Sequence, residues 1–159
     1  MKRIWSPWRM KYIQKHEKDD ECIFCLALKR PDDPENLVVY QGKRAFVIVN
    51  RFPYASGHLM VVPNAHQPDL DALDNDTRSE LIELLSQTES VLRRVYRPDG
   101  FNIGANIGAA AGAGVIGHFH FHVVPRWVGD TNFMSTLGEI RVLPEELEET
   151  HHKLKDAWQ

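Results

Sequence analysis

The stretch of sequence that decides the fold reads His118-Phe119-His120-Phe121-His122-Val123-Val124. Successive side chains of a β-strand point to opposite faces, so this spacing predicts a strand with three histidines on one face. The phenylalanines and Val123 would then lie on the other face, against a hydrophobic core. We expect the strand to span His118 to Val124 and to be closed by Pro125.

Taken alone, the three histidines leave two other interpretations open. They are compatible with ordinary surface histidines on an edge strand, whose polar tips face water. They are also compatible with a three-histidine zinc site, because catalytic zinc is often held by three protein ligands and a water molecule.

The loop before the histidines favours phosphate chemistry. The segment Gly108-Ala-Ala-Ala-Gly112-Ala-Gly114 has almost no side chains, which allows backbone N–H groups to approach a phosphate closely. A glycine-rich loop is weak evidence by itself. Here it directly precedes three alternating histidines, and the combination indicates a site for an anionic ligand.

The rest of the chain predicts an α+β fold with an antiparallel sheet of about five strands. Apolar residues at three- and four-residue spacing between Asp74 and Arg97 predict one long helix, with Asp76 or Thr77 as its cap. A shorter N-terminal helix is expected from Cys22 to Leu28, and an acidic helix after Pro144. The remaining strands are expected at residues 37–40, 45–49, 58–62 and 101–103.

Composition describes an ordinary globular chain. Of its 159 residues, 43% are hydrophobic and 26% are charged, and the net charge of −3 gives no general attraction to nucleic acid or to an anionic membrane. We expect one domain over residues 1–159, with an N-terminal arm at 1–21, a core at 22–127 and a C-terminal extension at 128–159. No signal peptide or membrane span is expected, and a cytoplasmic location follows.

These motifs resemble the histidine triad family. The run from His118 to Val124 is similar to the family signature of three histidines alternating with hydrophobic residues, and Asn50-Arg51-Phe52-Pro53 and Gly57-His58 are similar to its upstream motifs. The resemblance covers about residues 22–127. The segments Trp5–Ile13 and Pro125–Met134 look like the bacterial branch associated with diadenosine tetraphosphate phosphorylases.

The resemblance implies a mechanism and its residues. A neutral imidazole is a good nucleophile near pH 7, and His120, the central histidine, matches the nucleophile that the family uses to form a nucleotidyl intermediate. His122 is expected to contact phosphate oxygens or the leaving group, and His58 to orient the triad, although His58 also fits a polar residue at a strand end. The predicted nucleotide contacts are Asn50, Asn106, Gly112, Ala113, Gly114, His120 and His122.

Four residues predict a structural zinc site. Cys22, Cys25, His66 and His118 supply the number and type of ligands that form a closed tetrahedral site. The resemblance supports this set, because some relatives join a Cys-x-x-Cys pair to a later histidine and to the first histidine of the triad. Two alternatives remain: small core cysteines without metal, and a redox pair, which lacks the surrounding βαβ pattern.

The resemblance therefore implies phosphorolysis or hydrolysis of dinucleoside polyphosphates, with purine nucleotides as ligands, no organic cofactor and a homodimeric assembly. Hydrolysis of nucleoside phosphoramidates is an alternative that uses the same triad. A nucleotide-binding module with little turnover and a metal-dependent hydrolase are alternatives from other classes. The apolar residues Phe24, Phe46, Ile48 and Leu59 are compatible with an adenine slot but are more typical of core, so they are not assigned to the site.

Overall fold

The computed structural model describes residues 21–31, 33, 35–131 and 145–158. The aromatic residues of the predicted N-terminal arm, Trp5, Trp8 and Tyr12, lie outside the described residues. Residues 132–144 of the predicted C-terminal extension also lie outside the described residues.

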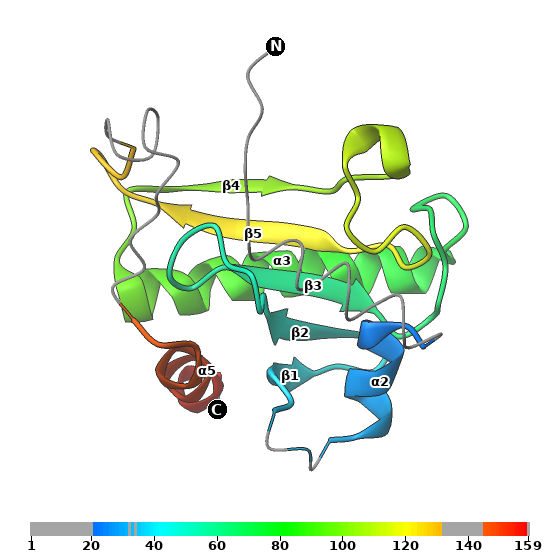
Figure 1. The fold of residues 1–159 in the computed structure, drawn as a ribbon, viewed down its shortest axis with the longest axis horizontal. Coiled ribbons are helices and arrows are strands. Elements are labelled where there is room, and N and C mark those ends of the chain that lie inside the picture. Colours follow the sequence, from blue (N-terminus) through cyan, green and yellow to red (C-terminus); the bar gives the residue numbers. More distant parts are fainter. Residues whose placement is uncertain (1–20, 32, 34, 132–144, 159) are drawn as a thin grey trace.

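Five strands form one antiparallel sheet in the order β1-β2-β3-β5-β4 (Figure 1). Their bounds are β1 Val38–Gln41, β2 Ala45–Val49, β3 Leu59–Pro63, β4 Gly100–Gly104 and β5 Phe121–Arg126. Every residue of β2 and β3 is buried, as expected for strands covered on both faces. The predicted α+β fold and five-stranded antiparallel sheet are confirmed.

Three α-helices pack around this sheet in the part of the chain that the structure describes. The long helix α3, Asn75–Tyr96, packs across one face, and its buried leucines repeat at three- and four-residue spacing. The predicted cap of α3 was wrong. Asp74 is the N-cap, and its side chain accepts a hydrogen bond from the Thr77 backbone N–H at 2.7 Å, so the helix begins before Asp76 and Thr77.

The two shorter helices lie at different ends of the sheet. The helix α2, Ile23–Lys29, is close to the predicted N-terminal helix, and α5, Leu147–Ala157, is the expected acidic helix. One continuous set of buried residues extends from Phe24 in α2 to Leu154 in α5. Within the described residues, no helix is long and apolar enough to cross a membrane.

The strand β5 differs from its predicted bounds. It begins at Phe121 rather than His118, because the ladder with β3 ends at the pair Val61–Phe121. It also continues through Pro125, which pairs with Phe101 of β4. Proline is tolerated there because the ladder with β3 reaches only to Val123, so on that side no partner strand requires an N–H donor from Pro125.

Candidate active site and metal centre

The three histidines lie where several segments meet at one end of the sheet. In Figure 1, α2 and the loops that follow β3 and β4 approach the start of β5 at this end. The predicted alternation of side chains holds although only His122 lies within the strand. The rings of His120 and His122 are 4.9 Å apart, and those of Phe119 and Phe121 are 5.0 Å apart.

The hydrogen bond of His120 determines which ring nitrogen is available for chemistry. His120 is 4% exposed, and its Nδ1 lies 2.9 Å from the backbone carbonyl oxygen of His118. A carbonyl oxygen can only accept, so Nδ1 carries the proton and Nε2 keeps its lone pair in the neutral ring. Burial lowers the pKa of His120, which favours the neutral form. His120 therefore presents an unprotonated Nε2, as a nitrogen nucleophile must.

A second chain of hydrogen bonds determines the tautomer of His122. The Tyr54 backbone N–H donates to His58 Nδ1 at 3.0 Å, so the proton of the neutral His58 ring must be on Nε2. His58 Nε2 lies 3.0 Å from His122 Nδ1 and donates to it. The neutral His122 ring consequently carries its own proton on Nε2, the opposite arrangement to His120.

The charge state of His122 follows from its surroundings. Burial, with a smaller contribution from the nearby His120, lowers the pKa of His122 to about 4. At neutral pH the pair therefore combines a lone pair on His120 Nε2 with an N–H donor on His122 Nε2. This combination suits attack on a phosphorus atom together with stabilisation of a departing oxygen.

Asn50, a predicted nucleotide contact, comes directly after β2 and is buried. Its side-chain oxygen accepts the Phe52 backbone N–H at 2.9 Å, and its amide nitrogen lies 3.4 Å from both ring nitrogens of His58. Asn50 thus joins the loop between β2 and β3 to the histidine cluster. Its contact with a nucleotide stays a prediction.

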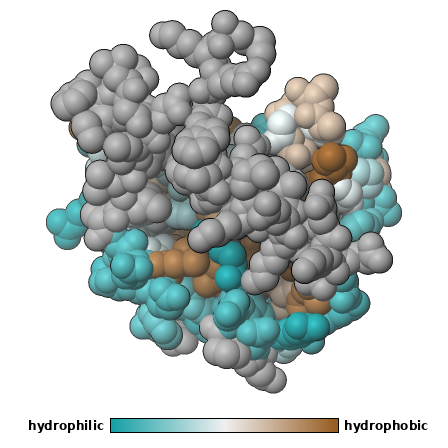
Figure 2. Space-filling view, in the orientation of Figure 1, coloured by the Kyte–Doolittle hydropathy of each residue, from teal (hydrophilic) through white to brown (hydrophobic). Residues whose placement is uncertain are grey.

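The glycine-rich loop between β4 and β5 is largely exposed, and Figure 2 shows a mainly white to brown, non-hydrophilic surface over this part of the molecule. A 3-10 turn, Ala109–Ala111, lies between Gly108 and Gly112, whose φ angles of 78° and 82° favour glycine. The N–H groups of Gly112 and Ala113 donate within the loop, to Ala109 and Gly108 carbonyls. The roles predicted for Asn106, Gly112, Ala113 and Gly114 in phosphate binding stay predictions, and in this conformation the amides of Gly112 and Ala113 already have partners.

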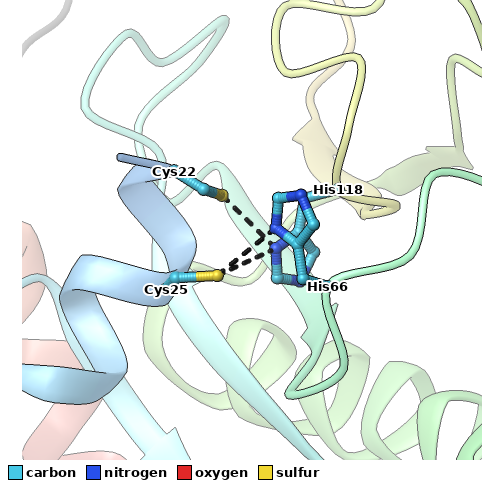
Figure 3. A group of neighbouring side chains, drawn as sticks. All are labelled: Cys22, Cys25, His66 and His118. Carbon is cyan, nitrogen blue, oxygen red and sulfur yellow. Dashed lines mark hydrogen bonds between the residues drawn. The ribbon is translucent and has the colours of Figure 1, made fainter. Parts of the chain in front are cut away.

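All four predicted metal ligands come together (Figure 3). The ligand atoms of Cys22, Cys25, His66 and His118 lie within 4.8 Å of one another. The S to N separations are 3.4 Å for Cys22–His118, 3.4 Å for Cys25–His66 and 3.7 Å for Cys25–His118. A tetrahedral zinc ion with ordinary bond lengths places sulfur and nitrogen ligands about 3.6 Å apart, so these three separations fit this metal.

A hydrogen bond to the backbone also fixes the tautomer of His118 in a form that can bind a metal. Its Nε2 donates to the Pro63 backbone carbonyl at 2.8 Å, which leaves an unprotonated Nδ1 directed at the two thiols. His66 lies close to Gly117, where an added Cβ would meet His66 Nε2 at 3.3 Å. Burial and the neighbouring Cys22 raise the pKa of Cys25. A bound divalent cation would stabilise both cysteines as thiolates.

Two residues of this region were not assigned from sequence. Phe24, between the two cysteines, is 1% exposed and packs against the rings of His118 and His120 at centroid distances of 5.3 and 5.0 Å. Tyr54 contacts the rings of His58 and His122. From sequence, Phe24 is more typical of core, and Tyr54 has no predicted role. Their positions in Cys-Ile-Phe-Cys and in the turn before Gly57-His58 were the available signals.

Similarity to known proteins agrees with this geometry. A model of the HIT domain, the domain of the histidine triad family, matches residues 32–128, more than half of the chain. The chain belongs to the HIT family. The HIT protein described here is also 36% identical over 165 residues to the AP-4-A phosphorylase of Mycobacterium tuberculosis, an alignment that covers 99% of this chain and 85% of the relative.

Solved HIT structures share the fold. A hypothetical histidine triad nucleotide-binding protein from Sulfolobus tokodaii superposes with a TM-score of 0.70 at 27% identity, covering 86% of this chain and 91% of the other. A zinc-bound histidine triad family protein from Mycobacterium smegmatis has a TM-score of 0.69 at 31% identity, covering 87% and 93%. The family resemblance predicted from the motifs is confirmed.

Proposed function

We propose that this HIT protein cleaves dinucleoside polyphosphates, with diadenosine tetraphosphate as the leading substrate, through a nucleotidyl intermediate on His120. The observation that carries the proposal is the pair of opposite tautomers. His120 Nδ1 donates to the His118 carbonyl, so His120 Nε2 carries a lone pair. The hydrogen bond from His58 leaves His122 with its proton on Nε2. Similarity to an AP-4-A phosphorylase along nearly the whole chain supports the substrate class.

The proposed reaction has two displacements. In the first, His120 Nε2 forms a bond to the α-phosphorus while the bond from that phosphorus to its bridging oxygen breaks, and ATP leaves as an anion. His122 Nε2–H donates a hydrogen bond to the leaving oxygen or to a phosphate oxygen, and His58 holds His122 in the required tautomer. In the second, water or orthophosphate attacks the same phosphorus and restores His120, giving AMP or ADP.

We further propose that Cys22, Cys25, His66 and His118 hold a structural zinc ion. The bound metal would join α2 to the segment that carries His120, and it is outside the chemical steps. A closed set of four protein ligands supports a structural rather than a catalytic role.

A homodimer is proposed on the basis of the sheet edge. In the described part of the chain, β4 pairs only with β5, and Ile103 on this edge strand is 45% exposed. An open edge with an exposed apolar residue favours pairing with a second copy. Light scattering on wild-type protein and on Ile103→Glu tests this, because a dimer through β4 should dissociate in the variant.

Product analysis tests the proposed function. Purified protein is incubated with diadenosine tetraphosphate, with and without orthophosphate, and the nucleotides are separated by chromatography. ADP and ATP that appear only with phosphate would establish a phosphorylase, and AMP and ATP regardless of phosphate would establish a hydrolase. Absence of products, together with AMP release from a nucleoside phosphoramidate, would replace the proposal with the phosphoramidase alternative. No turnover of either substrate would favour a binding module.

A further inference from the structure

Tyr54 packs against the hydrogen-bonded pair of His58 and His122. Its ring lies 4.6 Å from the His58 ring and 5.8 Å from the His122 ring, and it is nearly parallel to the latter, at 26°. His58 is completely buried, whereas Tyr54 is 49% exposed. The tyrosine therefore forms an outer layer between solvent and the hydrogen bond that joins His58 to His122.

The same residue acts on this pair through its backbone. The Tyr54 N–H donates to His58 Nδ1 at 3.0 Å, and this bond is what places the His58 proton on Nε2, toward His122. The loop that presents the N–H is braced independently of the Tyr54 side chain. Phe52 N–H donates to the Asn50 side chain at 2.9 Å, and His58 N–H donates to the Ala55 carbonyl at 3.1 Å.

We propose that Tyr54 is a positioning residue that holds His122 as an Nε2–H donor, by stacking on His122 and by keeping water from the His58–His122 hydrogen bond. The proposal rests on the proposed function for its catalytic consequence. Water that reaches His122 Nδ1 or His58 Nε2 would compete for the bond, and a His122 ring free to exchange tautomers would present a lone pair to an anionic leaving group for part of the time. The aromatic face, and not the hydroxyl, is the part of Tyr54 that is needed.

The test uses the full-length protein with three substitutions. Tyr54→Leu removes the aromatic face, and Tyr54→Phe keeps it. Tyr40→Leu is the matched control, because Tyr40 is a partly buried tyrosine that stacks on Trp158 at 5.3 Å, on β1 and away from the triad. Each protein is labelled with ¹⁵N-histidine, and the ring nitrogens of His122 are assigned with a His122→Gln variant.

Two readouts separate positioning from a general structural effect. In wild type, Tyr54→Phe and Tyr40→Leu, the ¹⁵N shifts should show an unprotonated Nδ1 and a protonated Nε2 on His122. In Tyr54→Leu, both nitrogens should move toward the average of two tautomers. The kcat for diadenosine tetraphosphate should fall about tenfold or more, which is part of the rate enhancement that a general acid or hydrogen-bond donor provides. The KM should change by less than about twofold.

Unchanged nitrogen shifts in Tyr54→Leu would overturn the proposal, as would a kcat within about twofold of the Tyr40→Leu control. A fall of the same size in Tyr54→Phe would overturn the assignment to the aromatic face. If the wild-type protein does not turn over diadenosine tetraphosphate, the proposed function fails, and the nitrogen shifts still decide whether Tyr54 sets the tautomer of His122.

Discussion

Replacement of Phe24 by leucine tests whether α2 supports the nucleophile. The Phe24 ring is 1% exposed and contacts the rings of His118, His120 and Phe46 at 5.3, 5.0 and 6.5 Å. Leucine keeps most of the buried apolar volume but loses the contacts between aromatic rings, so the free energy of unfolding should fall by about 1.5 kcal/mol. For a domain of this size, that corresponds to a decrease in Tm of about 3–6 °C.

The effect of Phe24→Leu on activity should exceed its effect on stability. A displacement of a reacting group by about 1 Å can cost about a hundredfold in rate, and a smaller shift of His120 should lower kcat about tenfold. Phe24 has almost no surface left for a nucleotide, so KM should stay within about twofold of the wild-type value. The matched control is Leu154→Val, a fully buried residue of α5 with a comparable stability cost of about 1 kcal/mol.

Calorimetry and steady-state kinetics on the same preparations measure both effects. If Phe24→Leu and Leu154→Val lose similar stability and keep equal kcat, the contact between Phe24 and His120 does not position the nucleophile. A large rise in KM in Phe24→Leu would instead mean that this residue belongs to the nucleotide pocket.

Three further predictions concern pH, metal and helix capping. The pKa of His122 is lowered from 6.5 to about 4, so on acidification the unfolded chain binds a proton at this residue before the folded protein does. The contribution of His122 to stability is therefore complete above pH 6.5 and is lost between pH 6.5 and about 4. The kcat/KM should likewise persist below pH 6, and a decline centred at pH 6.5 in a pH profile would contradict this. Gly117→Ala should press a Cβ against His66 and weaken zinc binding about tenfold in a chelator competition, whereas Gly100→Ala, which meets no atom within 4 Å, should leave it unchanged. Asp74→Ala should lower the free energy of unfolding by about 1 kcal/mol in denaturant titration, with kcat unaffected; a loss of activity would show that the start of α3 also supports the site.

The sequence predicted the elements whose patterns are local. The two-residue period from His118 to Val124 predicted which side chains share a face, and the repeat of leucines in α3 predicted the long helix. The sequence also predicted that Cys22, Cys25, His66 and His118, which are up to 96 residues apart, come together, because the set is typical of a family motif rather than of a local structure. That they bind zinc stays a prediction.

The features that the sequence predicted wrongly or did not predict depend on residues that are close in space. The start of β5 at Phe121 is set by where β3 stops pairing, and that is not encoded in the histidine run itself. The cap at Asp74 was missed because several adjacent polar residues fit the same role, and only the geometry of the first turn distinguishes them. The tautomers of His120 and His122 depend on a carbonyl and an amide from the backbone, which no pattern of side chains reveals.

The proposed role of His120 as nucleophile can be tested by locating a nucleotidyl adduct on the protein. Wild-type protein and His120→Ala are mixed rapidly with the p-nitrophenyl ester of AMP, quenched in alkali and digested for mass spectrometry. A good leaving group should speed the first displacement and allow the intermediate to accumulate. We expect an adenylyl group on His120 in the wild type, and no adduct and no turnover in His120→Ala, which should still bind nucleotide. An adduct on another residue, or normal turnover by His120→Ala, would show that His120 is not the nucleophile.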